Sequence, residues 1–248
     1  MQGRRIGRFE VEGALGAGGM GVVYAARDTV LDRRVALKLL HARADDAGAR
    51  ARLLREARSA AALSHPNVVT VFEVGDDQGV VFVAMELVAG ESLADRIERA
   101  PLATGEALTL ALGIARGLQS AHRVGVVHRD LKPANVVLAT PELPKIVDFG
   151  LARAPARRSE EDSTLSGHVA GTPGYMAPEQ IRGEATDERA DVFAFGVVLH
   201  EMLTRRLPFG GSGLSAMTAT LIDEPAPLGD AAPPPIASLV ARSSAATP

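Results

Sequence analysis

The segments HRDLKPAN and DFG, which begin at residues 128 and 148, bring carboxylate, ammonium and amide groups together in a loop-rich part of the chain. Asp130 could orient or accept the proton of a hydroxyl group, and Lys132 could stabilise a transferring group that carries negative charge. Asn135 and Asp148 offer the oxygen atoms that Mg²⁺ prefers. A base, a cation and a magnesium site are what phosphoryl transfer requires. The joint spacing of these residues favours this chemistry over four unrelated solvated loop residues.

A glycine-rich segment, GAGGMG, lies near the N-terminus and places glycines at positions 16, 18 and 21. Gly16, Gly18 and Gly21 would let backbone amides approach a phosphate where a Cβ atom would obstruct them. The pattern is short, so a plain turn explains it equally well when it is taken alone. A dinucleotide-binding fold needs a helix after the third glycine, whereas VVYAAR is typical of a strand. We therefore expect a β-hairpin that closes over a triphosphate.

Lys38 lies in VALK, an otherwise apolar predicted strand. A cation at a strand end is the simpler interpretation of these four residues. Glu56, in the predicted helix at 49–64, is a carboxylate that could pair with Lys38 and direct its ammonium group at the α and β phosphates of a nucleotide.

Residues 8–88 are expected to form a sheet with one helix. Segment 49–64 has helical periodicity, and it separates the third from the fourth of five predicted strands. The strands are FEVEGAL, GVVYAARD, RRVALKLL, VVTVFEVG and GVVFVAMEL, and the apolar positions of the helix are Leu53, Ala57, Ala60 and Leu63.

Beyond residue 90 the pattern changes to helices. One helix is predicted from Thr104, its candidate N-cap, and a second apolar helix spans DVFAFGVVLHEMLT. Segment 128–180 is dense in Pro, Gly, Asp and Asn, which favours loops, and 223–248 predicts a loosely ordered end with one short helical candidate, PPIASLVARS. The apolar stripe expected on the first helix is Leu108, Ala111, Ala115, Leu118 and His122.

Composition excludes several classes of protein. The 248 residues are 46% apolar, which suffices for one large domain or two small lobes around a cleft. With 27 basic and 30 acidic residues the net charge is -3, so we expect no nucleic-acid partner. The sequence has no cysteine, which excludes disulfides and thiolate metal sites and fits a reducing compartment. No apolar run approaches the ~20 residues of a membrane helix.

Taken in order, GAGGMG, VALK, HRDLKPAN, DFG and APE resemble the signature of protein kinases. HPNVV, DFGLAR and GTPGYMAPEQ are most similar to the bacterial branch of the eukaryotic-type (Hanks-type) serine/threonine protein kinases. The resemblance implies an α+β, two-lobed protein kinase-like fold, with a small antiparallel β lobe plus one helix and a larger, mostly helical lobe. The implied catalytic domain covers 8–248, divided into an N-lobe at 8–85, a hinge at 86–90 and a C-lobe at 91–248.

The same resemblance implies a role for each matched residue and makes ATP the phosphoryl donor. Asp191 would brace the catalytic loop, which is the HRDLKPAN segment at 128–135, from the helix below it. The phosphates would lie under Gly16, Gly18 and Gly21, and adenine would face Val23, Ala36, the gatekeeper Met85 and the hinge backbone of Glu86 and Val88. Lys38 and Glu56 would form the activating ion pair, Asp130 and Lys132 would act on the hydroxyl and phosphoryl groups, and Asn135 and Asp148 would hold Mg²⁺, or Mn²⁺ in its place.

Lys132 and the Thr172 of GTPGY resemble the class that acts on serine and threonine, so proteins carrying these hydroxyls are the implied substrates. Arg129 resembles the arginine of kinases that are switched on by phosphorylation of the activation loop. We hypothesise autophosphorylation at Thr164 or Ser166, with the phosphate docking near Arg129 and Arg153, and a kinase dimer would allow this reaction in trans. The alternative is that this segment is only a polar loop.

The chain departs from the family near its C-terminus. The last helices of the C-lobe are expected to be missing, together with the arginine that usually pairs with the glutamate of APE, here Glu179. We therefore expect a fold of low stability, and a truncated or pseudokinase nucleotide-binding scaffold is the alternative function. The intact Lys38, Asp130 and Asp148 favour an enzyme, and GTPGY and APE favour protein over small-molecule substrates. A cytoplasmic location is expected for this domain, although a longer relative could be membrane-anchored.

Overall fold

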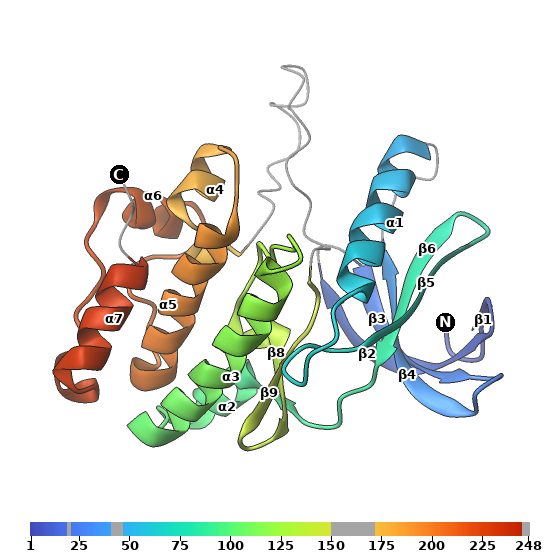
Figure 1. Ribbon diagram of the computed structural model, residues 1–248, viewed down its shortest axis with the longest axis horizontal. Coiled ribbons are helices and arrows are strands. Elements are labelled where there is room, and N and C mark those ends of the chain that lie inside the picture. Colours follow the sequence, from blue (N-terminus) through green and yellow to red (C-terminus); the bar gives the residue numbers. More distant parts are fainter. Residues whose placement is uncertain (19–20, 41–46, 150–171, 245–248) are drawn as a thin grey trace.

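The N-terminal part of the chain folds into one antiparallel sheet with a helix packed against it, and the rest is mostly helical (Figure 1). The computed structural model describes residues 1–18, 21–40, 47–149 and 172–244. The first sheet has six strands in the order β1-β2-β3-β4-β6-β5. Their bounds are β1 Arg5–Ile6, β2 Phe9–Gly18, β3 Gly21–Asp28, β4 Arg33–Leu40, β5 Val71–Asp77 and β6 Val80–Glu86.

Strand β4 shows how the pattern of residues positions the chemistry. Val35, Leu37 and Leu39 pack into an apolar cluster on one face of the sheet, while Ala36 and Leu40 pack into another on the opposite face. Successive side chains of a strand point to opposite faces, so Lys38 shares the face of Ala36 and Leu40. Helix α1, Ala47–Ala61, supplies Ala57 to this same cluster. The predicted strands and the predicted helix of this lobe are all present.

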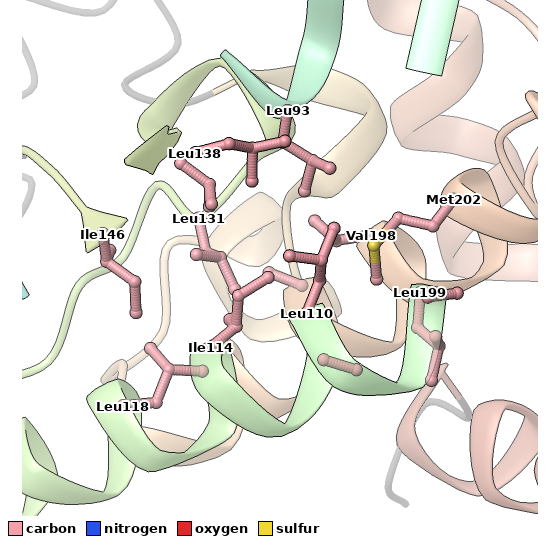
Figure 2. Close-up of a cluster of buried hydrophobic side chains, with 14 of the residues drawn as sticks. Leu93, Leu110, Ile114, Leu118, Leu131, Leu138, Ile146, Val198, Leu199 and Met202 are labelled. Atoms are coloured by element: carbon pink, nitrogen blue, oxygen red, sulfur yellow. The ribbon is translucent and has the colours of Figure 1, made fainter. Parts of the chain in front are cut away.

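The C-terminal part is built around two long helices, α3 and α5. Side chains from α2, α3, the catalytic loop, β8, β9 and α5 converge in one buried apolar cluster, part of which Figure 2 shows. The bounds of the helices are α2 Leu93–Arg99, α3 Thr104–His122, α4 Pro178–Arg182, α5 Glu188–Thr204, α6 Leu214–Ile222 and α7 Pro234–Ser244. The bounds of the strands are β7 Glu91–Ser92, β8 Val136–Thr140 and β9 Leu143–Ile146.

Helix α3 differs from the prediction in two respects. Its N-cap is Ala103, and Thr104 is the first helical residue and provides no side-chain cap. The buried face is rotated by about one residue from the predicted stripe, because Leu108 and Ala115 are only half-buried. The buried residues are Ala107, Leu110, Ala111, Gly113, Ile114, Gly117, Leu118 and Ala121. Two of these are glycines, which allow α3 to approach β9 closely.

Two further elements lie where the sequence suggested irregular structure. Strands β8 and β9 form an antiparallel hairpin inside the predicted loop region. Strand β8 begins directly after the HRDLKPAN segment, and β9 ends two residues before Asp148 of the DFG segment. Helix α7, Pro234–Ser244, forms at the helical candidate PPIASLVARS, within the segment that was otherwise expected to be loosely ordered, and it buries Val240 in the large apolar cluster. The end of the described chain is therefore packed on the helical lobe rather than loosely ordered.

The two lobes are joined by more than the hinge. Val68 and Ile146 form an isolated parallel bridge, so the segment that precedes β5 pairs directly with β9. The backbone of Asn67 and Val69 exchanges hydrogen bonds of 2.9 Å with Ile146, and the Asn67 amide donates to the carbonyl of Pro144 at 2.8 Å.

None of the described helices is both long enough and apolar enough to span a lipid bilayer.

The close contact between α3 and β9 predicts that Gly113→Val is destabilising. A Cβ atom at Gly113 would lie 2.6 Å from Cγ of Pro144 and 2.9 Å from the Asn67 amide nitrogen. We expect this overpacking to lower the free energy of unfolding by about 2 kcal/mol or more, measured by urea denaturation.

Gly105→Val provides the matched control in the same helix. A Cβ atom at Gly105 meets nothing within 4 Å, so this substitution should change the free energy of unfolding by less than about 0.5 kcal/mol. Equal losses in the two variants would contradict close packing at Gly113.

Candidate active site

The glycine-rich segment forms the predicted hairpin, in which β2 and β3 pair antiparallel up to Gly18 and Gly21. Gly21 has a φ of 153°, and a Cβ atom there would collide with the carbonyl oxygen of Leu39 on β4. Packing within the sheet therefore already requires this glycine. Gly16 is exposed, and a Cβ atom would meet nothing within 4 Å, so its open backbone leaves room for a ligand. The strand after Gly21 excludes the helix of a dinucleotide-binding motif.

Lys38 is buried, and its ammonium group forms an ion pair of 2.8 Å with Oδ2 of Asp148. This contact joins β4 of the small lobe to a residue that lies two positions after the end of β9. Asp148 has a φ of 67°, in the left-handed region that few non-glycine residues adopt. Glu56 lies on α1 and is half-buried, and its pairing with Lys38 stays a prediction.

The residues predicted to surround adenine come together in one apolar cluster. Ala36 and Met85 are buried in it, and Val23 and Val88 pack against it. Val147, immediately before the DFG segment, packs against the same cluster and was not predicted. The side chain of Glu86 points elsewhere, because its Oε2 accepts a hydrogen bond of 2.9 Å from Nζ of Lys145 on β9. The backbone N–H of Glu86 is also engaged, because it donates to the carbonyl of Thr70 at 2.9 Å, so neither this N–H nor the side chain is left for a nucleotide.

Asp130, Lys132 and Thr172 form a compact polar cluster. Nζ of Lys132 donates to Oδ2 of Asp130 at 2.8 Å and to the hydroxyl of Thr172 at 2.6 Å. The backbone N–H and the hydroxyl of Thr172 each lie 3.2 Å from Oδ1 of Asp130. The cluster is partly exposed, so a hydroxyl group from another molecule could reach the carboxylate. It brings together the carboxylate and the ammonium group that the sequence analysis assigned to one site.

Asn135 and Asp148 are suited to a hard divalent cation. The amide nitrogen of Asn135 donates to the carbonyl and to Oδ2 of Asp130, at 2.8 and 3.3 Å. These bonds orient Nδ2 toward the loop, and Oδ1 makes no hydrogen bond to any described residue. The described part of the chain contains no cluster of three acidic or histidine side chains around a metal position. Mg²⁺ needs fewer protein ligands, because substrate phosphates and water complete its coordination.

The backbone of the catalytic loop is held by Asp191 of α5, as predicted. The fully buried carboxylate accepts hydrogen bonds of 2.8 Å from the backbone N–H groups of His128 and Arg129. Nε2 of His122, at the end of α3, lies 2.7 Å from Oδ2 of the same carboxylate. Arg129 has a φ of 67°, so this brace fixes a strained backbone next to Asp130.

The predicted regulatory residues fall into two groups. Thr164, Ser166 and Arg153 lie outside the described residues. Arg129 is described, and its Nε atom is buried without a hydrogen-bond partner among the described residues. A buried guanidinium nitrogen without an acceptor is unfavourable, so an anionic or polar group that accepted a hydrogen bond from this Nε would be stabilising.

Two polar contacts near Thr172 were not predicted. The hydroxyl of Tyr175 donates to Oε2 of Glu201 on α5 at 2.6 Å. Burial raises the pKa of both groups, and the hydroxyl partly offsets this effect by lowering the pKa of Glu201. The amide of Gln180, on α4, donates to the carbonyl of Arg129 at 2.8 Å. No sequence motif connects these partners, which are 26 and 51 residues apart.

Glu179, expected to lack its usual arginine, is only half-buried. A large desolvation cost requires complete burial, and that condition is not met here. The pKa of the nearby Arg189 is raised mainly by Asp187, with a smaller contribution from Glu179.

Comparison with known proteins places these features in a family. The protein kinase domain model matches residues 9–231. The chain is 40% identical to serine/threonine-protein kinase pkn3 of Myxococcus xanthus over 229 residues, which are 89% of this chain and 42% of that protein. It is 39% identical to serine/threonine-protein kinase PrkC of Bacillus subtilis over 212 residues, which are 84% of this chain and 32% of that protein. The chain thus spans less than half the length of these relatives.

A solved structure has the same fold. The crystal structure of the PknI kinase domain of Mycobacterium tuberculosis superimposes with a TM-score of 0.77 at 29% sequence identity. The match covers 100% of this chain and 91% of that one.

The contact between Tyr175 and Glu201 predicts a pH-dependent loss of stability in Tyr175→Phe. Burial raises the pKa of Glu201 in the folded state above its ordinary value of 4.5. The folded state therefore binds this proton more tightly than the unfolded state does, and the protein loses stability as the pH rises from 4.5 through the raised pKa. Removing the hydroxyl raises this pKa further and should cost about 1–3 kcal/mol at neutral pH. The difference should narrow as the pH falls toward 4.5, and urea denaturation at both pH values measures it.

Tyr24→Phe is the matched control, since these are the only two tyrosines of the chain. The hydroxyl of Tyr24 has no hydrogen bond to a described residue, so this variant should unfold like the wild type at both pH values. A loss in Tyr175→Phe that does not depend on pH would count against the role of Glu201.

Proposed function

This chain belongs to the protein kinase domain family, and on that basis we propose that it transfers the γ-phosphate of ATP to serine and threonine hydroxyls of proteins. The observation that carries the proposal is the contact of Asp130 and Lys132 with one threonine hydroxyl, that of Thr172. The names of its bacterial relatives are in keeping with this activity. Proteins related to this chain along most of its length thus share the proposed reaction class.

The mechanism assigns a separate task to each polar group. Asp130 orients the substrate hydroxyl and accepts its proton, because its carboxylate is held next to the position of a hydroxyl oxygen. Lys132 places its ammonium group beside the same oxygen, where it stabilises charge on the transferring group. Lys38 would orient the α and β phosphates, and its partner Asp148 would help to hold the metal ion.

ATP and Mg²⁺ supply the phosphoryl group and the neutralising charge when bound. Asn135 and Asp148 would hold the ion, with Mn²⁺ as a substitute, and Val23, Ala36 and Met85 would enclose the adenine. The backbone of Glu86 and Val88 offers the hydrogen-bonding groups of the hinge. Gly16, Gly18 and Gly21 would cover the phosphates, and Glu56 would support Lys38.

Regulation by autophosphorylation extends this proposal. A phosphate on Thr164 or Ser166 would bring three acceptor oxygens and nearly two negative charges to the site. Arg129, whose Nε has no hydrogen-bond partner among the described residues, is a suitable partner, and Arg153 would add a second guanidinium group. A transient dimer would let one kinase domain modify another, and the cytoplasm, where ATP is available, is the proposed location of the reaction.

We expect Asp130→Asn to reduce phosphoryl transfer to a protein substrate by a factor of about 10² to 10⁴ while ATP binding persists. The amide keeps the size of the side chain but cannot accept the proton. Transfer of radioactive phosphate to myelin basic protein measures activity, and calorimetry measures nucleotide binding. Asp223→Asn, at an exposed carboxylate after α6, should behave like the wild type. If Asp130→Asn kept full activity, the chain would use another base, and if the wild type had no activity, the chain would be a scaffold.

Incubation with ATP and Mg²⁺ should add phosphate to Thr164 or Ser166, detected by mass spectrometry of proteolytic peptides. Addition of active wild-type protein should modify the Asp130→Asn variant if the reaction occurs in trans. An active preparation with both hydroxyls unmodified would rule out these sites.

A further inference from the structure

We propose that Gln180 is a positioning residue for Asp130, acting through the peptide bond that joins Arg129 to Asp130. The inference rests on the proposed phosphoryl transfer and adds a residue to its machinery. Gln180 touches neither the substrate hydroxyl nor the nucleotide. Its contribution is to fix the backbone from which the catalytic carboxylate extends.

The peptide group between Arg129 and Asp130 is held at both of its polar atoms. Its carbonyl accepts a hydrogen bond of 2.8 Å from Nε2 of Gln180, and its N–H donates to Nδ1 of His128 at 3.2 Å. Because a peptide group is planar, fixing these two atoms fixes the orientation of the whole plane and of the attached Cα of Asp130. Loss of either bond frees a rotation that moves the carboxylate.

Outside support is needed here because the backbone is strained. Arg129 has a φ of 67°, in the left-handed region that is unfavourable for a non-glycine residue. Asp191 holds the N–H side of Arg129, whereas Gln180 holds its carbonyl side. Strained conformations persist only when their surroundings determine them from several directions. Asp191 alone leaves the peptide group nearest to Asp130 free on its carbonyl side.

The orientation of the Gln180 amide is set by its second contact. Oε1 accepts a hydrogen bond of 3.0 Å from the backbone N–H of Ala177, at the start of α4. A backbone N–H can only donate and a carbonyl can only accept, so Oε1 must face Ala177 and Nε2 must face Arg129. Gln180 thus joins the segment that carries Thr172 to the catalytic loop at a second point.

These two contacts define two alternative roles that a single substitution separates. Capping of α4 needs only an acceptor at position 180, and glutamate at the third helical position caps as well as glutamine. Holding the Arg129 carbonyl needs a donor, which an ionised glutamate lacks. Gln180→Glu therefore keeps the cap of α4 and removes the hydrogen bond to the Arg129 carbonyl, whereas Gln180→Met removes both contacts.

The test compares wild type, Gln180→Glu, Gln180→Met and Asp130→Asn in steady-state phosphorylation of myelin basic protein. Gln180→Glu should lower kcat about tenfold, because small displacements of a catalytic group are costly. Its KM for ATP should stay within about twofold, since the adenine and phosphate contacts are unchanged. Wild-type kcat in Gln180→Glu would overturn the inference and leave Gln180 as a helix cap.

Hydrogen exchange provides a readout that does not depend on activity. Peptides that cover 124–133 should exchange faster in both Gln180 variants than in the wild type, while peptides from β3 and β4 should not change. Unchanged exchange at 124–133 would overturn the inference even if activity fell. If the wild type and Asp130→Asn were equally inactive, the proposed function would fail, and exchange alone would decide the role of Gln180.

Discussion

The buried carboxylate of Asp191 is the constraint on which the rest of the site depends. A carboxylate without exposure is stable only when hydrogen bonds replace its water, and here two backbone N–H groups and the ring of His122 do so. The residue also lies near the N-terminus of α5, where the helix dipole favours a negative charge. Its hydrogen bonds fix His128 and Arg129, and through them the position of Asp130.

Helix α5 extends this constraint to the substrate side of the site. Glu201, almost three turns after Asp191, receives the hydroxyl of Tyr175 and so fixes the segment that brings Thr172 to Asp130. Buried apolar residues on most faces of α5 anchor the helix in two separate clusters. One rigid element therefore positions both Asp130, the proposed base, and the surface that a substrate hydroxyl would approach. Chemistry on loops depends here on a helix that itself contains none of the reacting groups.

Much of this arrangement could be predicted from the sequence, because some patterns have local causes. The bounds of β3 and β4 follow from short, mostly apolar runs that Gly, Asp and Arg residues delimit. The buried face of α3 was misjudged because Gly113 and Gly117, which make its closest contacts, carry no apolar side chain to mark them. The β8–β9 hairpin was missed because its strands are short and lie among turn-forming residues.

The residues of the site likewise divide into those that the sequence alone indicated and those that it did not. Asp130, Lys132, Asn135 and Asp148 could be proposed from the sequence because their types and order carry chemical meaning. Gln180, Glu201 and Lys145 were missed because each acts on a partner far away in the sequence, and their types are common on protein surfaces. Such contacts depend on the packing of whole helices and strands, which residue spacing does not encode.

The left-handed backbone of Arg129 and Asp148 narrows the substitutions that these two positions can accept. Aspartate tolerates this conformation better than most residues, so at 148 the backbone and the proposed metal site ask for the same side chain. At 129 the two demands conflict, because glycine would relieve the strain and arginine does not. The arginine that stands there keeps the strain, and this is in keeping with the proposed role of its guanidinium group in binding a phosphate.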